Sequence, residues 1–132
     1  MNVTTLINKA IEVRQYAYAP YSKFKVGAAV LTDSDTVYTG CNVENASYGG
    51  TICAERVAIC CAVAAGEKNI KAIAIVFDEK IFATPCGICR QFIFEFGNEI
   101  DVISANLKGE YEVKKISQLL PDGFGGEFIE NH

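Results

Sequence analysis

Three cysteines and one glutamate carry the clearest chemical signal in this chain of 132 residues. Cys53 and Glu55 are separated by a single alanine, and Cys86 and Cys89 follow within the segment Pro-Cys-Gly-Ile-Cys. Three thiolates can hold one zinc ion and leave its fourth tetrahedral position open for water. Water on zinc ionises near neutral pH, and a carboxylate that is not a ligand can then move protons. The pattern therefore predicts a hydrolytic zinc site in which Glu55 acts as acid and base.

The remaining cysteines and the histidine narrow the ligand set. Cys60 lies seven residues after Cys53, which is about 10 Å along a helix. Two sulfurs that are each about 2.3 Å from one zinc ion cannot be that far apart. We expect Cys60, Cys61 and Cys41 to be small buried hydrophobic residues. The only histidine is His132, at a chain end, so we expect neither a histidine ligand nor a Ser-His or Cys-His hydrolase.

Two arginines follow the predicted site residues directly. Arg56 comes after Glu55, and Arg90 comes after Cys89. Three thiolates would leave zinc with a net negative charge, which weakens its effect on bound water. We interpret both arginines as outer partners that donate hydrogen bonds to the sulfurs and withdraw charge. The alternative is that both are solvated helix arginines.

Hydrophobic periodicity and turn residues predict an α/β protein. We expect helices over 6–17, 53–65, 87–96 and 116–120, and strands over 26–32, 36–42, 72–77, 102–105 and 110–114. This order favours a three-layer α/β/α fold, with a mixed five-stranded sheet covered by helices on both faces, in a single domain over residues 1–132. Cys53 and Glu55 do not share a helix face. Both can therefore reach one zinc-bound water only if their helix points its N-terminal tip into the site.

Composition limits the partners. The net charge is −4 and no lysine or arginine cluster occurs, which argues against a nucleic acid polymer and favours a small-molecule substrate. The longest apolar run, residues 57–65, is too short to span a bilayer, and we see no signal-peptide pattern. Six cysteines without a secretion signal favour a reducing compartment, so we expect a cytoplasmic protein. The hydrophobic content of 50% is high for a small monomer and suggests an oligomer.

Four blocks in order closely resemble the small, homotetrameric, zinc-dependent cytidine deaminases of nucleoside salvage, in the cytidine and deoxycytidylate deaminase superfamily. The blocks are YAPYSKF (18–24), GCNVENA (40–46), TICAER (51–56) and PCGICRQ (85–91), followed by Leu119-Leu120-Pro121 and Phe124. The Cys-x-Glu and Pro-Cys-x-x-Cys pair is the signature of zinc deaminases. The resemblance covers nearly the whole chain, although Cys-x-x-Cys alone would be a weak signal.

The resemblance implies a reaction and a cofactor. Cytidine and deoxycytidine would be deaminated hydrolytically to uridine and deoxyuridine, with release of ammonia and with one zinc ion per chain. Glu55 would take a proton from water, deliver it to ring nitrogen 3 and then protonate the departing ammonia. Phe24 would pack against the pyrimidine ring, and the Ala54 backbone would bind the amide edge of the base.

The resemblance also implies sugar contacts and shared sites. Asn42 and Glu44 would hydrogen-bond the ribose hydroxyls, and their i, i+2 spacing at a strand end puts both on one side. An anionic Glu44 would repel a sugar phosphate. Without the resemblance, a strand-end turn would be the favoured interpretation of the same two residues. Tyr48 and Phe124 resemble positions that reach into a neighbouring subunit's pocket, so the sites would require the homotetramer.

Other interpretations remain open at this point. The substrate could be another cytosine-bearing compound, since Gly49, Gly50 and Ile88 depart from the commonest family pattern and bear on the width of the pocket and its tolerance of modified bases. A thioredoxin-like redox protein would explain Cys86 and Cys89 but not Cys53. A structural zinc module would need a fourth protein ligand, for which Cys41 is a distant candidate.

Overall fold

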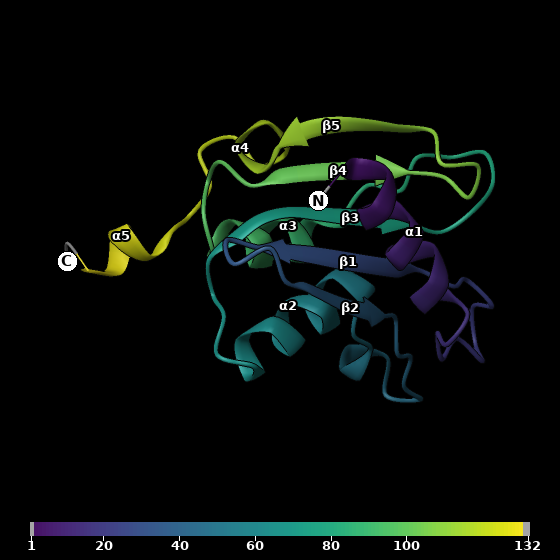
Figure 1. Ribbon diagram of the computed structural model, residues 1–132. Helices are drawn as coiled ribbons and strands as arrows, with labels where there is room; N and C mark the ends of the chain where they lie inside the picture. The colour runs from purple at the N-terminus through teal and green to yellow at the C-terminus, as the bar shows by residue number, and fades with distance from the viewer. Residues whose placement is uncertain (1, 131–132) are drawn as a thin grey trace.

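A mixed sheet forms the centre of the molecule (Figure 1). The computed structural model describes residues 2–130, and the side chains of all of these except 128 and 130, so His132 lies outside the described residues. Within this range the five-stranded sheet has the order β2-β1-β3-β4-β5, formed by β1 (Gly27–Thr32), β2 (Val37–Cys41), β3 (Ile70–Val76), β4 (Asp101–Ala105) and β5 (Tyr111–Lys115). β3 and β4 pair in parallel, and the other neighbours pair antiparallel. The predicted mixed sheet is confirmed.

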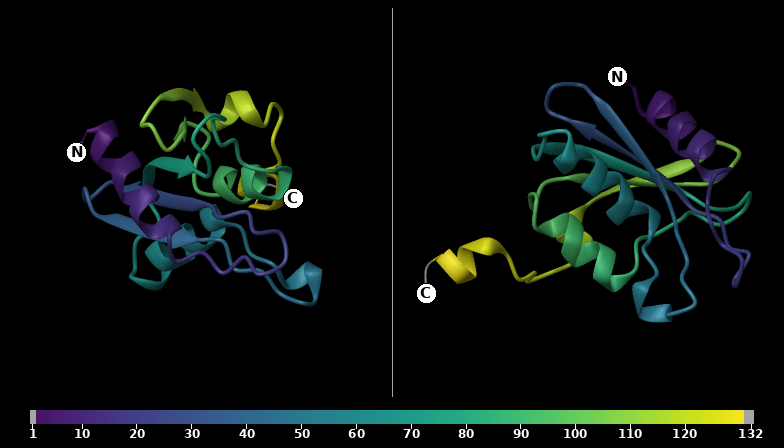
Figure 2. Two further views of the ribbon diagram at one scale, coloured as in Figure 1. Left: turned by 90° about the vertical axis from the view of Figure 1, so that its right-hand side faces the viewer. Right: turned by 90° about the horizontal axis from the view of Figure 1, so that it is seen from below.

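Helices cover both faces of this sheet (Figure 2). The helical segments are α1 (Val3–Arg14), the short 3-10 turn η1 (Tyr48–Gly50), α2 (Ala54–Ala64), α3 (Gly87–Phe94), α4 (Ile116–Leu119) and α5 (Gly126–Glu130). α1 lies on one face, whereas α2 and α3 lie on the other, as the three-layer prediction required. The chain after α4 leaves the sheet, and α5 extends away from it (Figures 1 and 2).

The strand β3 shows how the two faces differ. Ile73 and Ile75 point into the core under α2 and α3, while Ala72 and Ala74 alternate into the core under α1. These side chains are almost fully buried, as expected for a central strand covered on both faces. Small alanines on the α1 side leave room for that helix to pack close to the sheet. Large and small residues therefore sort by face rather than at random.

The first helix differs from the prediction at its C-terminal end. The periodic pattern suggested that it runs to Ala17, but α1 ends at Arg14. The reason is tertiary pairing: the Tyr18 N–H donates to the Asn42 carbonyl at 2.9 Å, and the Tyr18 carbonyl accepts from the Glu44 N–H at 2.8 Å. An extended segment beside Asn42 thus replaces the last helical turn.

The cysteines of α2 correct another expectation. We expected Cys60 and Cys61 to be buried, but both are exposed, and Cys41 is partly buried. α2 buries one face, through Ala54, Ala58, Ile59 and other residues, and presents the opposite face to solvent. Apolar residues lie on both faces of this helix, with Ala58 and Ala62 buried but Val63 and Ala64 exposed, and this hides its amphipathic period in the sequence.

Strand register brings distant segments to one edge of the sheet. Gly27, at the start of β1, pairs with Cys41 at the end of β2 and with Val76 at the end of β3. Residues that precede β1 or follow β2 and β3 therefore emerge side by side. This edge is also where the parallel strands β3 and β4 end, which is the usual place for a binding site in such sheets.

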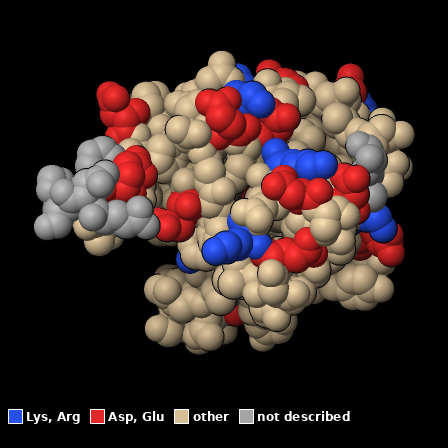
Figure 3. All heavy atoms as spheres, turned by 60° about the vertical axis from the view of Figure 1, so that its left-hand side comes forward, with Lys and Arg blue, Asp and Glu red and all other residues tan. Residues whose placement is uncertain are grey.

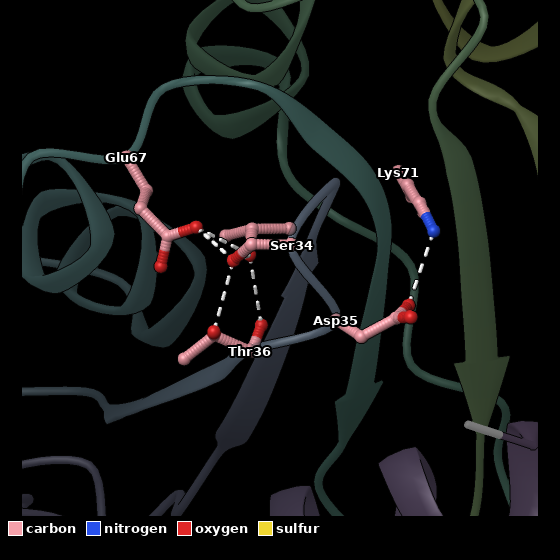
Figure 4. A network of polar contacts seen from close by, with 6 residues as sticks. Ser34, Asp35, Thr36, Glu67 and Lys71 are labelled. Carbon is pink, nitrogen blue, oxygen red and sulfur yellow. Dashed lines mark hydrogen bonds and ion pairs between the residues drawn. The ribbon is translucent and has the colours of Figure 1, made fainter.

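A polar network holds the opposite end of α2 (Figure 4). The Glu67 carboxylate, just after α2, accepts hydrogen bonds from Thr32, at 2.9 Å, and from Ser34 in the β1–β2 turn. Lys71 in β3 forms an ion pair of 3.1 Å with Asp35 of the same turn. The hairpin, the loop after α2 and β3 are thereby joined, which fixes the height of α2 on the sheet.

The surface charges and the lengths of the helices bear on which partners the protein can have. On the face shown in Figure 3, acidic and basic side chains alternate and no broad basic area forms. None of the helices in residues 2–130 has both the length and the apolar content needed to cross a membrane.

Gly40 lets β2 approach α2 closely, and its replacement tests that contact. A Cβ atom at Gly40 would lie 2.4 Å from the Ala58 backbone nitrogen. We expect Gly40→Ala to lower the free energy of unfolding by about 1–3 kcal/mol, because backbone must move to admit the methyl group. Urea denaturation measures the loss. Gly49→Ala is the control, since nothing lies within 4 Å of its Cβ position, and equal stability losses in both variants would contradict the close contact.

Candidate active site

Three thiols meet where two helices begin. Cys53 is the N-cap of α2, Cys86 is the N-cap of α3, and Cys89 lies in the first turn of α3. Their sulfur atoms all lie within 4.8 Å of one another, and the Sγ atoms of Cys53 and Cys86 are 3.9 Å apart. Two sulfurs on one tetrahedral zinc ion should be about 3.8 Å apart. The cluster could therefore hold a zinc ion with little movement.

The fourth position of such a site is not taken by a protein side chain. Among residues 2–130, no fourth histidine, cysteine, aspartate or glutamate joins the three thiols as a ligand candidate. Three protein ligands are typical of catalytic zinc sites, whereas structural sites usually have four. The geometry thus disfavours the structural zinc module, including the version with Cys41.

The protonation of the thiols follows from their contacts. A hydrogen bond from Cys89, together with one from Arg56, lowers the pKa of Cys53 to about 5 despite partial burial. The same hydrogen bond to Cys53, with burial, raises the pKa of Cys89. Because a metal binds thiolates, loading zinc would release protons from this cluster.

Glu55 lies at the tip of α2, beside the thiols. Its side chain is 4% exposed. Burial raises the pKa of Glu55 to about 7, and the nearby Cys53 thiolate adds to the effect. Cys53 and Glu55 line the same cavity although they lie two residues apart. The N-terminal tip of α2 therefore faces the site, as the spacing of these residues required.

A cavity of ≈ 210 Å³ joins this centre to the other predicted residues. Of the predicted set, its lining includes Phe24, Asn42, Cys53, Ala54, Glu55 and Cys86. The other lining residues were not predicted from their residue types or spacing; they are Val26, Thr51, Ile75, Phe77, Ala83 and Thr84. Phe77 directly follows a buried parallel strand, and that position could have indicated it.

Aromatic and amide side chains form another part of the cavity lining. The rings of Phe24 and Phe77 lie 4.6 Å apart between centroids. Asn42 is 7% exposed; its amide donates to the Phe24 carbonyl at 2.7 Å and accepts from the Val26 N–H at 2.8 Å. Asn42 therefore fixes the segment that carries Phe24, and it still has one donor hydrogen and one acceptor position for another partner.

Glu44 lies in a neighbouring hollow rather than in the same cavity. That hollow has a volume of ≈ 340 Å³, and Tyr48 and Thr51 contribute to its lining. Thr51 also borders the cavity with the thiols, so the two spaces adjoin. The Glu44 carboxylate accepts from the backbone N–H groups of Tyr21 and Ser22 at 3.0 and 3.1 Å.

Tyr48 and Phe124 lie apart from the thiols of their own chain. Tyr48 is 78% exposed and meets the ring of Tyr21 edge-on, with centroids 6.2 Å apart. Phe124 is 55% exposed, and its carbonyl accepts from the Gln91 side chain at 2.6 Å. Neither residue lines the cavity that contains Glu55. Within one chain, Tyr48 therefore borders only the hollow that contains Glu44, and Phe124 lines neither space.

The two arginines behave differently from each other. Arg56 donates to the Cys53 sulfur at 3.6 Å and to the Thr51 carbonyl at 3.4 Å, as its predicted role requires. Arg90 was expected to donate to the sulfurs as well, but its guanidinium donates to the carbonyls of Pro85, at 2.8 Å, and Leu119, at 3.0 Å. The Arg90 side chain thereby links α3 to the end of α4 and to the loop before Cys86.

Three thiols that could hold zinc, with a buried carboxylate beside them, are typical of one class of enzyme, the zinc hydrolases. Residues 1–105 match the family model described as the cytidine and deoxycytidylate deaminase zinc-binding region. The chain belongs to this family.

Individual relatives agree along nearly their whole length. A cytidine deaminase from Sporosarcina psychrophila is 47% identical over 128 residues, which cover 96% of this chain and 94% of that protein. One from Halalkalibacterium halodurans is 44% identical over 128 residues, with 96% and 97% covered. The crystal structure of cytidine deaminase from Burkholderia pseudomallei superposes with a TM-score of 0.90 at 46% identity, over 94% of this chain and 100% of that one.

Removing one thiol should remove the metal. We expect Cys86→Ala to lower bound zinc from about one ion per chain to a small fraction, because two thiolates hold zinc far more weakly than three. Elemental analysis of the purified protein measures this content. Cys60→Ala is the matched control, since Cys60 is exposed on the outer face of α2. Full zinc content in Cys86→Ala would exclude Cys86 as a ligand.

Proposed function

We propose that the protein catalyses the hydrolytic deamination of cytidine and deoxycytidine to uridine and deoxyuridine, with release of ammonia, in pyrimidine nucleoside salvage. The observation that carries this proposal is the buried Glu55 beside three clustered thiols, in one cavity with Phe24 and Asn42. The names of the family relatives support cytidine as the substrate over other cytosine-bearing compounds.

The chain's own residues divide the chemistry. Cys53, Cys86 and Cys89 would hold zinc, which would act as a Lewis acid and activate water near neutral pH. Glu55 takes the proton from the attacking water and delivers it to ring nitrogen 3 of the base. After attack at carbon 4, Glu55 takes the remaining proton from the new hydroxyl group on that carbon and passes it to the amino group. The bond between carbon 4 and the amino nitrogen then breaks, so water is consumed, ammonia departs and a carbonyl group is left at carbon 4. Burial of Glu55 keeps bulk water from competing for this proton.

Other residues of the cavity and of the adjoining hollow orient the substrate. Phe24, supported by Phe77, contacts the pyrimidine ring, and the N-terminal backbone at Ala54 binds the amide edge of the base. Asn42 and Glu44 bind the ribose hydroxyls from two adjoining spaces. The reducing environment of the cytoplasm, where we place the enzyme, keeps the three thiols available for metal.

The same proposal includes a homotetramer with shared sites. Tyr48 and Phe124 are exposed and lie outside the cavity of their own chain. The segment around Phe124 leads into α5, which extends away from the sheet (Figure 1). A neighbouring chain could therefore bring these aromatic side chains to the open side of the pocket.

An ultraviolet assay tests the reaction itself. We expect the purified protein to convert cytidine to uridine, and a strong chelator to reduce the rate to below about a tenth, because activation of water requires the metal. Added zinc should restore the rate. A zinc-loaded protein that forms no uridine from cytidine or deoxycytidine would overturn the proposed function.

Replacement of Glu55 separates proton transfer from metal binding. We expect Glu55→Gln to lower kcat by about 10²–10⁴-fold, because an amide cannot carry the proton. Zinc content should stay at the wild-type level, since Glu55 is not a ligand. Glu12→Gln is the control, an exposed glutamate of α1 on the other face of the sheet. Wild-type turnover in Glu55→Gln would refute the assigned role.

Mixed assemblies test whether sites are shared. Glu55→Gln chains lack the proton carrier, and chains with both Tyr48→Ala and Phe124→Ala lack the aromatic contribution to a neighbour. We expect each alone to have low activity and a co-refolded mixture to recover a measurable part of it, because some sites then combine intact residues from two chains. Activity in the mixture that never exceeds the sum of the separate variants would contradict shared sites.

A further inference from the structure

We propose that the Ser22 hydroxyl is a positioning group that orients the Glu44 carboxylate toward the sugar of the substrate. This inference rests on the proposed function, in which Glu44 binds a ribose hydroxyl. Ser22 contacts Glu44 twice: its hydroxyl donates to Oε2, and its backbone N–H donates to Oε1 at 3.1 Å. The Tyr21 N–H completes the clamp by donating to Oε1 at 3.0 Å.

The Ser22 hydroxyl is itself held in one orientation. Its oxygen accepts from the Phe24 N–H at 3.0 Å. With that acceptor position used, the hydroxyl proton is free to point at Glu44, and the structure shows this donation. The hydrogen bond from the Ser22 hydroxyl is also the largest contribution that lowers the pKa of Glu44, so the carboxylate stays ionised.

Counting acceptor positions shows what the clamp leaves for a substrate. A carboxylate offers about four lone-pair sites, two on each oxygen. The backbone N–H groups of Tyr21 and Ser22 use both sites on Oε1, and the Ser22 hydroxyl uses one on Oε2. One acceptor site on Oε2 remains for an incoming hydroxyl group. Ser22 therefore sets both the orientation of Glu44 and the oxygen at which it can bind sugar.

Backbone strain at the next residue supports a functional reason for this turn. Lys23 has a φ of 62°, a left-handed conformation that residues with a side chain rarely adopt. The hydrogen bond from the Phe24 N–H to the Ser22 oxygen spans Lys23 and holds it in that conformation. The turn thereby places Ser22 against Glu44 and Phe24 against Phe77.

The contact to Glu44 should matter more than the contact to Phe24. A hydrogen bond to a carboxylate is roughly twice as strong as one between neutral groups. Phe24 has further support, because its carbonyl accepts from Asn42 at 2.7 Å and its ring lies against Phe77. Loss of the Ser22 hydroxyl should therefore weaken sugar binding first and base binding second.

Steady-state kinetics with two substrates test this order. We expect Ser22→Ala to raise KM for cytidine about tenfold while kcat changes less than about threefold, because one charge-assisted hydrogen bond is lost and Glu55 is untouched. For 2′,3′-dideoxycytidine, which lacks the 2′ and 3′ hydroxyl groups and keeps the 5′ one, the loss in kcat/KM should stay below about threefold. Ser22→Thr keeps a hydroxyl and should restore most of the affinity for cytidine.

A double-mutant cycle and controls complete the experiment. In a protein that already carries Glu44→Ala, the further change Ser22→Ala should lower kcat/KM for cytidine by less than about threefold, because the carboxylate that Ser22 contacts is already absent. Ser47→Ala is the matched control, since the Ser47 side chain does not cap the turn it precedes. In each of these variants, the zinc content and the midpoint of thermal unfolding should match those of the wild type.

The outcomes separate this inference from the function on which it rests. Equal losses for cytidine and dideoxycytidine, or an undiminished effect in the Glu44→Ala background, would overturn the role of Ser22. Unchanged kinetics in Ser22→Ala would do the same while leaving cytidine deamination standing. A wild-type protein that does not act on cytidine would instead remove the proposed function, and the inference with it.

Discussion

The N-termini of α2 and α3 lie close together. Cys53 and Cys86 are the N-cap residues of these helices, and their sulfur atoms are 3.9 Å apart. Both helix termini present backbone N–H groups and a partial positive charge, which favours thiolates there. A shift of either helix along its axis would separate the sulfurs. The rest of the fold therefore has to hold α2 in place, and it does so through the close contact at Gly40 and the Glu67 network beyond its other end.

The sheet supplies the remaining half of the site through its register. Pairing of Gly27 with Cys41 and with Val76 brings three chain segments to one edge. Phe24, Asn42 and Phe77 emerge there and line one cavity with Cys53, Cys86 and Glu55. The Asn42 side chain joins two of these segments directly, because it donates to the Phe24 carbonyl and accepts from the Val26 N–H. Residues far apart in the chain thus form one cavity because the strands that carry them are paired.

Much of this could be predicted from residue types and spacing. The three cysteines and Glu55 are informative because metal geometry restricts which residues can be ligands, and the alternation of elements indicates the layers. Exposure of Cys60 and Cys61 could not be predicted, because an alanine-rich helix has little contrast between its faces. The partners of Arg90 and Ser22 depend on loops that meet only in the folded chain.

The proposed reaction depends on a zinc ion with three sulfur ligands and one open position, and X-ray absorption at the zinc edge tests this coordination most directly. For the zinc-loaded protein we predict three sulfur scatterers at about 2.3 Å and one oxygen at about 2.0–2.2 Å. Addition of a pyrimidine nucleoside should alter the oxygen shell and leave the sulfur shell intact. A shell of four sulfurs, or one dominated by nitrogen and oxygen, would contradict the account.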